Sequence, residues 1–331
     1  MYFPDLSARF AAILPTLQGR RFVIIGHARP DGDCIGSQVA MARLLTSRGI
    51  ECVCVNPDPV PRRLTFISEG LTFLRTDDIL ARASEYEAIF VDCADHARAG
   101  ERLRQAFPKP VLAFDHHLSN DGFACNNFLD TKSSATCELL AGMFLDNGLP
   151  IDPAMAVALY AGILTDTGQF RFNSTTRITF GVASELLDRG VVPAEVAYQI
   201  YEREPIGKLR LLQRFLASLQ MECAGRACIG RLPLGVYAET GTNSEDAEGL
   251  VDYARIIDGV DVGVLIEERE DGSIKASLRA KDPSYRVDLI AAQFNGGGHA
   301  CAAGLSLKHD TAHFRERLVA AIQKQFDTMK R

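Results

Sequence analysis

Four short apolar runs, separated by stretches of helical periodicity, constrain the fold of this chain more than any other feature of its sequence. The runs have the length and composition of buried strands and lie at residues 22–25, 52–55, 88–91 and 111–114. Helical patterns lie near residues 35–48, 134–147, 153–164 and 176–189. Strands that alternate with helices usually pair in parallel, and helices then cover both faces of the sheet. The sequence therefore predicts an α/β fold with a mostly parallel sheet and helices on both faces.

The pattern changes after residue 190. Residues 191–222 have the periodicity of two amphipathic helices, broken at Pro205-Ile206-Gly207, and are predicted to connect two domains. Beyond them, strand-like runs lie at 227–232, 261–267 and 273–280, and helical patterns lie near 245–256, 286–294 and 310–326. These patterns predict a second, smaller α/β domain across a cleft from the first. The predicted boundaries are 1–190, 191–222 and 223–331.

Length and composition limit the classes to which the protein can belong. The longest apolar run, 154–164, is too short for a membrane span, which needs about 20 residues. The N-terminus has no basic region followed by an apolar core, and the nine cysteines form no C-x-x-C pair, so we expect reduced thiols in the cytoplasm. The net charge of −6 provides no basic field for long duplex DNA. A short anionic substrate stays compatible with this charge if bound cations offset the acidic groups.

Acidic and imidazole side chains follow three of the predicted strands. His27 comes after the first strand, Asp92 after the third, and Asp115-His116-His117 after the fourth. The carboxyl ends of parallel strands meet at one edge of the sheet, where ligands bind. Carboxylate oxygen suits hard divalent cations, and imidazole adds affinity for a transition metal such as Mn²⁺. The sequence therefore predicts a metal site at this edge.

Each of these residues also has a simpler interpretation. Asp31-Gly32-Asp33 has the composition of a turn in which Asp33 caps the next helix, and an Asp at a strand end, such as Asp92, is often a helix cap. Two adjacent histidines after a buried strand are harder to explain as solvated surface. Asp166, at the end of an apolar helix, is a costly buried charge unless a cation neutralises it.

Taken together, these groups are the ligand set of a two-metal phosphoesterase. The predicted metal ligands are His27, Asp31, Asp33, Asp92, His116 and Asp166. Two divalent cations are expected, with Mn²⁺ favoured and Mg²⁺ or Co²⁺ as alternatives.

The second domain contains a candidate anion site. The backbone amides of Gly296, Gly297 and Gly298 can converge on an anion, and His299 can add a donor, whereas the alternative is a flexible loop. Arg279, at the end of a predicted strand, is a candidate for a bidentate phosphate contact or, alternatively, a surface charge.

In their order along the chain, these segments resemble the motifs of the DHH phosphoesterase superfamily. Residues 27–37 resemble its first motif, Asp92 the second, Asp115-His116-His117 the third, Thr165-Asp166-Thr167-Gly168 the fourth, and 296–304 the GGGH loop of the DHH-associated C-terminal domain. The resemblance covers nearly the whole chain, and its layout is most similar to the nano-RNase/pAp phosphatase branch. Arg29 stands where an Asn is commoner, which leaves the ligands intact but alters a candidate substrate contact.

The resemblance implies a role for each residue. His27 and Asp31 would hold one metal, Asp33, His116 and Asp166 the other, and Asp92 would bridge both. His117 would stabilise charge on the substrate while Asp115 orients a neighbouring histidine. The substrate would be bound by His299, Arg279 and Gly296, Gly297 and Gly298, so that 1–190 is catalytic and 223–331 binds substrate.

The expected reaction is hydrolysis of single-stranded RNA or DNA of two to five nucleotides to mononucleotides, removal of the 3′-phosphate of 3′-phosphoadenosine 5′-phosphate (pAp), or both. The alternatives are a phosphodiesterase for linear dinucleotides (pGpG or pApA), a RecJ-like single-strand exonuclease, an inorganic pyrophosphatase, and a non-catalytic nucleotide-binding regulator. The presence of all six ligands disfavours the regulator. Whether the chain forms a homodimer stays open.

Overall fold

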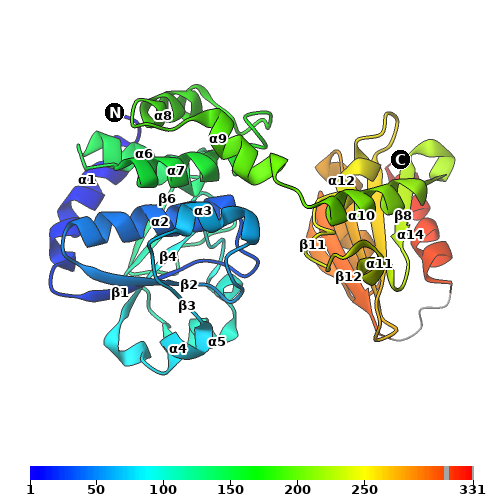
Figure 1. The fold of residues 1–331 in the computed structure, drawn as a ribbon, viewed down its shortest axis with the longest axis horizontal. Helices are drawn as coiled ribbons and strands as arrows, with labels where there is room; N and C mark the ends of the chain where they lie inside the picture. The colour runs from blue at the N-terminus through cyan, green and yellow to red at the C-terminus, as the bar shows by residue number, and fades with distance from the viewer. Residues whose placement is uncertain (309–312, 330–331) are drawn as a thin grey trace. The chain divides into compact units, whose positions relative to one another are not determined.

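The computed structural model describes residues 1–308 and 313–329, which form two compact units, Met1–Arg203 and Glu204–Arg331 (Figure 1). The division falls within the segment that was predicted to connect two domains. Its first helix, α9 (Pro193–Ala197), continues into a π-helical turn (Tyr198–Glu202) in unit 1, and its second helix, α10 (Ile206–Ala217), belongs to unit 2. Residues 220–222 are not helical as predicted, because they pair with a neighbouring strand as β7 (Gln220–Glu222).

Unit 1 contains a six-stranded sheet in which every pair of neighbours is parallel. Its order is β3-β2-β1-β4-β5-β6, with β1 at Arg21–Ile25, β2 at Glu51–Val55, β3 at Phe73–Leu74, β4 at Glu87–Val91, β5 at Leu112–Asp115 and β6 at Asn126–Leu129. All four predicted strands are present. β3 is too short and β6 too polar to be recognised from periodicity. The strand order reverses between β1 and β4, the point at which sheets of this type bind ligands.

Helices cover both faces of this sheet, as predicted (Figure 1). Alternate residues of β1 enter two separate cores, Phe22 on one face and Val23 on the other. The first core contains α1 (Pro4–Ile13), α2 (Gly32–Ser47), α3 (Thr65–Ser68), α6 (Thr136–Asp146), α7 (Pro153–Asp166) and α8 (Arg177–Leu187). The second core contains α4 (Thr76–Leu80) and α5 (Glu101–Ala106).

Glycine residues allow α7 to pack closely against both α2 and α6. A Cβ atom on Gly36 of α2 would lie 2.5 Å from the carbonyl oxygen of Ala158 in α7, and one on Gly162 would lie 2.3 Å from the Cys137 sulfur in α6. Both distances are shorter than any real contact, so larger side chains would force the helices apart. The close packing brings the first turn of α2, with Asp33, against the last turn of α7, with Asp166, since a Cβ atom on Gly32 would lie 2.3 Å from the Thr165 hydroxyl.

Unit 2 is built on a second six-stranded sheet in the order β11-β12-β10-β9-β8-β7. After β7 come β8 (Ala227–Leu232), β9 (Val262–Glu268), β10 (Ile274–Ala280), β11 (Gly297–His299) and β12 (Ala302–Leu307). Only β8 and β9 pair in parallel. One face packs on α10, α11 (Val236–Thr240) and α12 (Leu250–Arg255), and the other on α13 (Val287–Ala292) and α14 (Phe314–Thr328). The predicted second α/β unit is confirmed.

Three details of unit 2 differ from prediction. The helix predicted near 245–256 begins only at Leu250, and α11 was not predicted, since both segments are short and flanked by glycine. The helix predicted at 310–326 begins at Phe314, and its predicted residues 310–312 lie outside the described residues. The segment predicted as a glycine loop forms β11, which pairs with β12.

No helix within the described ranges is long and apolar enough to cross a membrane.

Candidate metal centre

The predicted metal ligands of unit 1 lie together at the carboxyl edge of its sheet. His27, Asp92 and His116 follow the ends of β1, β4 and β5, while Asp33 and Asp166 come from the facing turns of α2 and α7. Asp92 has a φ of 56°, a left-handed conformation that is uncommon outside glycine. Its backbone N–H still donates to the carbonyl of Phe114 on β5 at 2.9 Å. The strained backbone therefore turns the carboxylate into the site.

The first group of donors consists of His27, Asp31 and Asp92, whose ligand atoms lie within 4.8 Å of one another. The Nε2 atom of His27 lies 3.3 Å from Asp92 Oδ2 and 3.8 Å from Asp31 Oδ1. Its Nδ1 atom lies 2.9 Å from the carbonyl oxygen of Ala28, which can only accept a hydrogen bond. The proton of the neutral ring is therefore on Nδ1, and Nε2 presents a lone pair to a cation.

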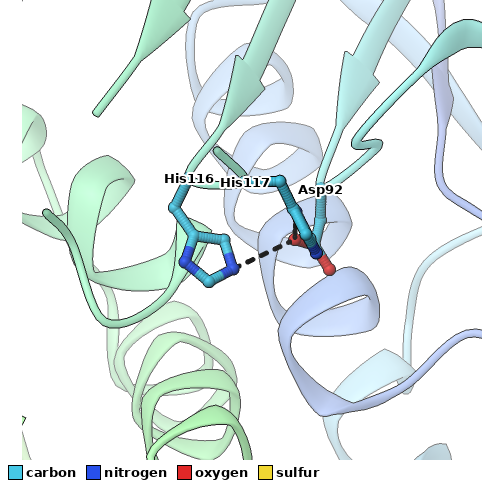
Figure 2. A group of neighbouring side chains, drawn as sticks. All are labelled: Asp92, His116 and His117. Carbon is cyan, nitrogen blue, oxygen red and sulfur yellow. Dashed lines mark ion pairs between the residues drawn. The ribbon is translucent and has the colours of Figure 1, made fainter. Parts of the chain in front are cut away.

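The second group consists of Asp33, His116 and Asp166, again within 4.8 Å. His116 repeats the arrangement of His27, with Nδ1 3.2 Å from the carbonyl oxygen of Ser133 and Nε2 3.3 Å from Asp166 Oδ2. The same Nε2 atom lies 3.8 Å from Asp92 Oδ1, and a dashed line in Figure 2 marks the pair. Asp92 thus faces the first group with one carboxylate oxygen and the second group with the other.

The carboxylates of the site are crowded. Burial, and then the charges of Asp92 and Asp166, raise the pKa of Asp33 well above its usual value. Burial also raises the pKa of Asp166 to about 7, despite the opposing charge of His116. Burial lowers the pKa of His116, but the charges of Asp33 and Asp166 outweigh it and raise that pKa to about 9. Like charges held this close favour a bound cation, so the residues present fit divalent metal ions.

Helix capping explains part of the cluster, though not in the way predicted. Asp31 Oδ1 accepts from the backbone N–H groups of Asp33 and Cys34 at 3.1 Å each, so Asp31, and not Asp33, caps α2. Asp92 is not a helix cap, because the short helix at residues 96–99 is capped by Asp95. The Asp166 side chain is 32% exposed, so it is a partly buried carboxylate.

A segment that the sequence predicted only as the start of a helix supports three of these ligands. The Thr136 hydroxyl donates to Asp92 Oδ1 at 3.0 Å. The backbone N–H groups of Thr136 and Cys137 donate to the two carboxylate oxygens of Asp33 at 2.7 and 2.8 Å. The adjacent Ser133 supplies the carbonyl oxygen that orients His116. No linear signal marks this role, because small polar residues at a helix start are common.

Replacement of Thr136 by valine is expected to weaken Mn²⁺ binding about 10- to 100-fold, because Asp92 loses the donor that orients its carboxylate. The Mn²⁺ dissociation constant, measured by electron paramagnetic resonance of free Mn²⁺, tests this. Thr136→Ser keeps the hydroxyl and should restore binding. Equal affinities in the valine variant and the unaltered protein would show that the contact has no influence on the site.

His117 has a different environment from His27 and His116. Its Nδ1 atom donates to Asp115 Oδ1 at 2.7 Å, and Asp115 Oδ2 accepts from Asn120 Nδ2 at the same distance. Asn120, which was not predicted, is held in turn by the carbonyl oxygen of Cys93. The His117 ring also lies close enough to Asp92 and His116 to form a third possible donor group (Figure 2).

In unit 2, Arg279 of β10 and His299 of β11 both pair with Ala302 of β12, so they lie on one face of the sheet with a single strand between them. Gly298 has a φ of 145°, and a Cβ atom on it would lie 2.4 Å from the Ala302 carbonyl oxygen. Nothing lies within 4 Å of a Cβ atom built on Gly297. Gly297 and Gly298 lie in an exposed edge strand, so this part of the segment is not the irregular loop of the alternative.

Two family profiles match the chain: "DHH family, N-terminal domain" at residues 21–163 and "DHHA1 domain" at residues 230–328. The chain is 31% identical over 316 residues to the Bifunctional oligoribonuclease and PAP phosphatase NrnA of Thermus thermophilus, covering 95% of this chain and 93% of that protein. It is 28% identical to the protein of the same name in Bacillus subtilis, covering 85% and 87% of the two chains.

Among solved structures, an exopolyphosphatase-related protein from Bacteroides fragilis superimposes with a TM-score of 0.89. The alignment covers 99% of this chain and 98% of that one at 23% identity, which shows a common fold.

Proposed function

The chain belongs to the DHH family, and we propose that it is a metal-dependent phosphoesterase that hydrolyses oligonucleotides of two to five nucleotides to mononucleotides and removes the 3′-phosphate of pAp. The observation that carries the proposal is the pair of donor groups on the two sides of the Asp92 carboxylate. The names of the relatives in Thermus and Bacillus support both activities.

One cation would be held by His27 and Asp31. The other would be held by Asp33, His116 and Asp166, and Asp92 would contact both. We propose Mn²⁺, because the set combines imidazole nitrogen with carboxylate oxygen, and Mg²⁺ or Co²⁺ are the alternatives. A pair of divalent cations supplies a nucleophile from water near neutral pH and offsets the charge on the phosphoryl group.

The protein's own groups orient the substrate. Asp115 accepts the Nδ1–H of His117, which leaves the Nε2 atom to face a phosphoryl oxygen, to which it donates when it carries a proton. Asn120 keeps the Asp115 carboxylate in this orientation. We assign His117 to the substrate because the other two donor groups each have three ligands without it. The free thiols of all nine cysteines support the cytoplasm as the location.

A panel of substrates tests the proposed function. Purified protein with Mn²⁺ should hydrolyse pAp, pGpG and a pentanucleotide, and should turn over a long single-stranded RNA poorly. Preference for the long RNA would favour a RecJ-like exonuclease instead, and preference for pGpG the linear-dinucleotide alternative. Hydrolysis of inorganic pyrophosphate alone would favour a pyrophosphatase. Binding of nucleotides without turnover under any metal would favour a regulator.

We further propose that unit 2 binds substrate through His299, Arg279 and Gly296, Gly297 and Gly298. His299→Ala should raise the KM for pAp about 10-fold with little change in kcat, because a charge-assisted hydrogen bond to phosphate is lost. His313, an exposed histidine of the same unit, provides a control, since His313→Ala should leave KM unchanged. An unaltered KM in His299→Ala would argue against substrate binding by this strand.

A further inference from the structure

The turn that follows Asp166, between α7 and α8 (Figure 1), has an unusual backbone. Gly168, Gln169 and Phe170 have φ angles of 54°, 64° and 61°, three successive left-handed residues of which only the first is glycine. Thr167 holds the turn. Its hydroxyl accepts from the Phe170 N–H at 3.0 Å, and its carbonyl oxygen accepts from the N–H groups of Arg171 and Phe172. Left-handed aromatic residues are rare, and such strain is concentrated at ligand-binding sites.

The strained turn places an aromatic ring and a guanidinium group on Gly168. A Cβ atom on Gly168 would lie 2.5 Å from the ring of Phe172, so the ring packs directly on this glycine. The Arg171 Nε–H donates to the Gly168 carbonyl at 2.7 Å. Phe172 is nevertheless 55% exposed. A large apolar ring is therefore presented to solvent six residues after a predicted metal ligand, Asp166.

Two further residues extend this surface. Tyr201, in the π-helical turn, is 37% exposed, and burial raises its pKa while the charges of Arg63 and Arg171 lower it. The charges of both guanidinium groups therefore act on its hydroxyl. The π-helical turn packs against the helical turn that contains Arg63. We call these four residues, Arg63, Arg171, Phe172 and Tyr201, the aromatic–arginine cluster. It combines rings with positive charge in a chain whose net charge is −6.

We propose that the aromatic–arginine cluster binds the nucleobase and adjoining phosphate of the substrate, with the base stacked on Phe172 and the phosphate near Arg171. The inference rests on the proposed function and adds how its substrate is recognised. Exposed rings beside arginines are the general means of binding single-stranded nucleotides, and stacking tolerates every base.

The test compares Phe172→Ala with the unaltered protein on pAp and on its base-free analogue, 1,2-dideoxyribose 3,5-bisphosphate. The KM for pAp should rise about 10-fold in the variant with kcat little changed, since stacking of one base is lost. The KM for the base-free analogue should be the same in both proteins. Phe172→Tyr should restore the KM for pAp. Phe180 is a matched control, because it is 57% exposed and stacks on Phe170 instead of Gly168. Phe180→Ala should leave KM unchanged.

Three outcomes would overturn the proposal. One is an equal KM for pAp in Phe172→Ala and the unaltered protein, and a second is an equal rise for pAp and the base-free analogue. The third is a lower molar mass of Phe172→Ala than of the unaltered protein in light scattering, with the same KM for pAp in both. That result would identify the surface as a contact between copies of the chain. Failure of the unaltered protein to hydrolyse any short nucleotide would instead reject the proposed function itself.

Discussion

Replacement of Asp92 by asparagine should reduce hydrolysis of a 5′-labelled trinucleotide about a thousandfold. Asp92 faces both donor groups, so the amide nitrogen of asparagine would remove a ligand oxygen from one of them. Loss of several kcal/mol of charge stabilisation corresponds to this change in rate. Asparagine is preferable to alanine here, because it tolerates the left-handed backbone at this position and keeps an acceptor for Thr136.

Asp95 provides the matched control for Asp92. It lies in the same loop, and its carboxylate accepts from the backbone N–H groups of Ala97 and Arg98 instead of facing the donor groups. Asp95→Asn keeps an oxygen for this cap and should retain full activity. Thermal melting of both variants would show whether they fold. Undiminished turnover by a folded Asp92→Asn variant would contradict the bridging role and the two-metal proposal with it.

Replacement of Asp33 by asparagine should remove most of the activity and also most of the stabilisation by metal. A cation that binds only the folded state at 100 times its Kd stabilises it by about 2.7 kcal/mol. For a unit the size of unit 1 this corresponds to a rise in Tm of roughly 5 to 10 °C. Asp33 is 1% exposed and belongs to the second donor group, so its loss should weaken binding there.

The metal-free Asp33→Asn protein separates binding from folding. Asparagine offers one oxygen where Asp33 accepts from two backbone N–H groups of α6, which destabilises the fold. The substitution also removes the repulsion of the Asp33 carboxylate by Asp92 and Asp166, which stabilises the fold. The measurement is therefore the difference between the Tm with and without Mn²⁺, in the variant and in the unaltered protein. The same Mn²⁺-induced shift in both would exclude Asp33 as a ligand.

The fold of unit 1 could be predicted because its central elements have strong local signals. The apolar runs of β1, β2, β4 and β5 and the periodicity of α2, α6, α7 and α8 are visible within about ten residues of sequence. β3 and β6 carry no such signal, since they are short edge segments that depend on pairing with β2 and β5. Local patterns report burial, and the edge strands are only partly buried.

The chemical type of the candidate site was also readable from the sequence. Carboxylates and imidazoles directly after buried strands must lie at one edge of a parallel sheet, whatever the details of packing. The sequence does not show how each histidine is oriented. The carbonyl of Ser133, 17 residues after His116, determines which nitrogen of that ring faces the carboxylates.

By itself, the sequence determined the class of fold, the strands after which the candidate ligands lie, and the chemical type of those candidates. Only the tertiary structure decided that Thr136 supports Asp92, that α6 donates to Asp33, and that the turn with Arg63 packs against the turn with Tyr201. The physical reason is distance along the chain. Asp33 and Thr136 are 103 residues apart, and their hydrogen bond exists because α2 and α6 pack together, which no local periodicity encodes.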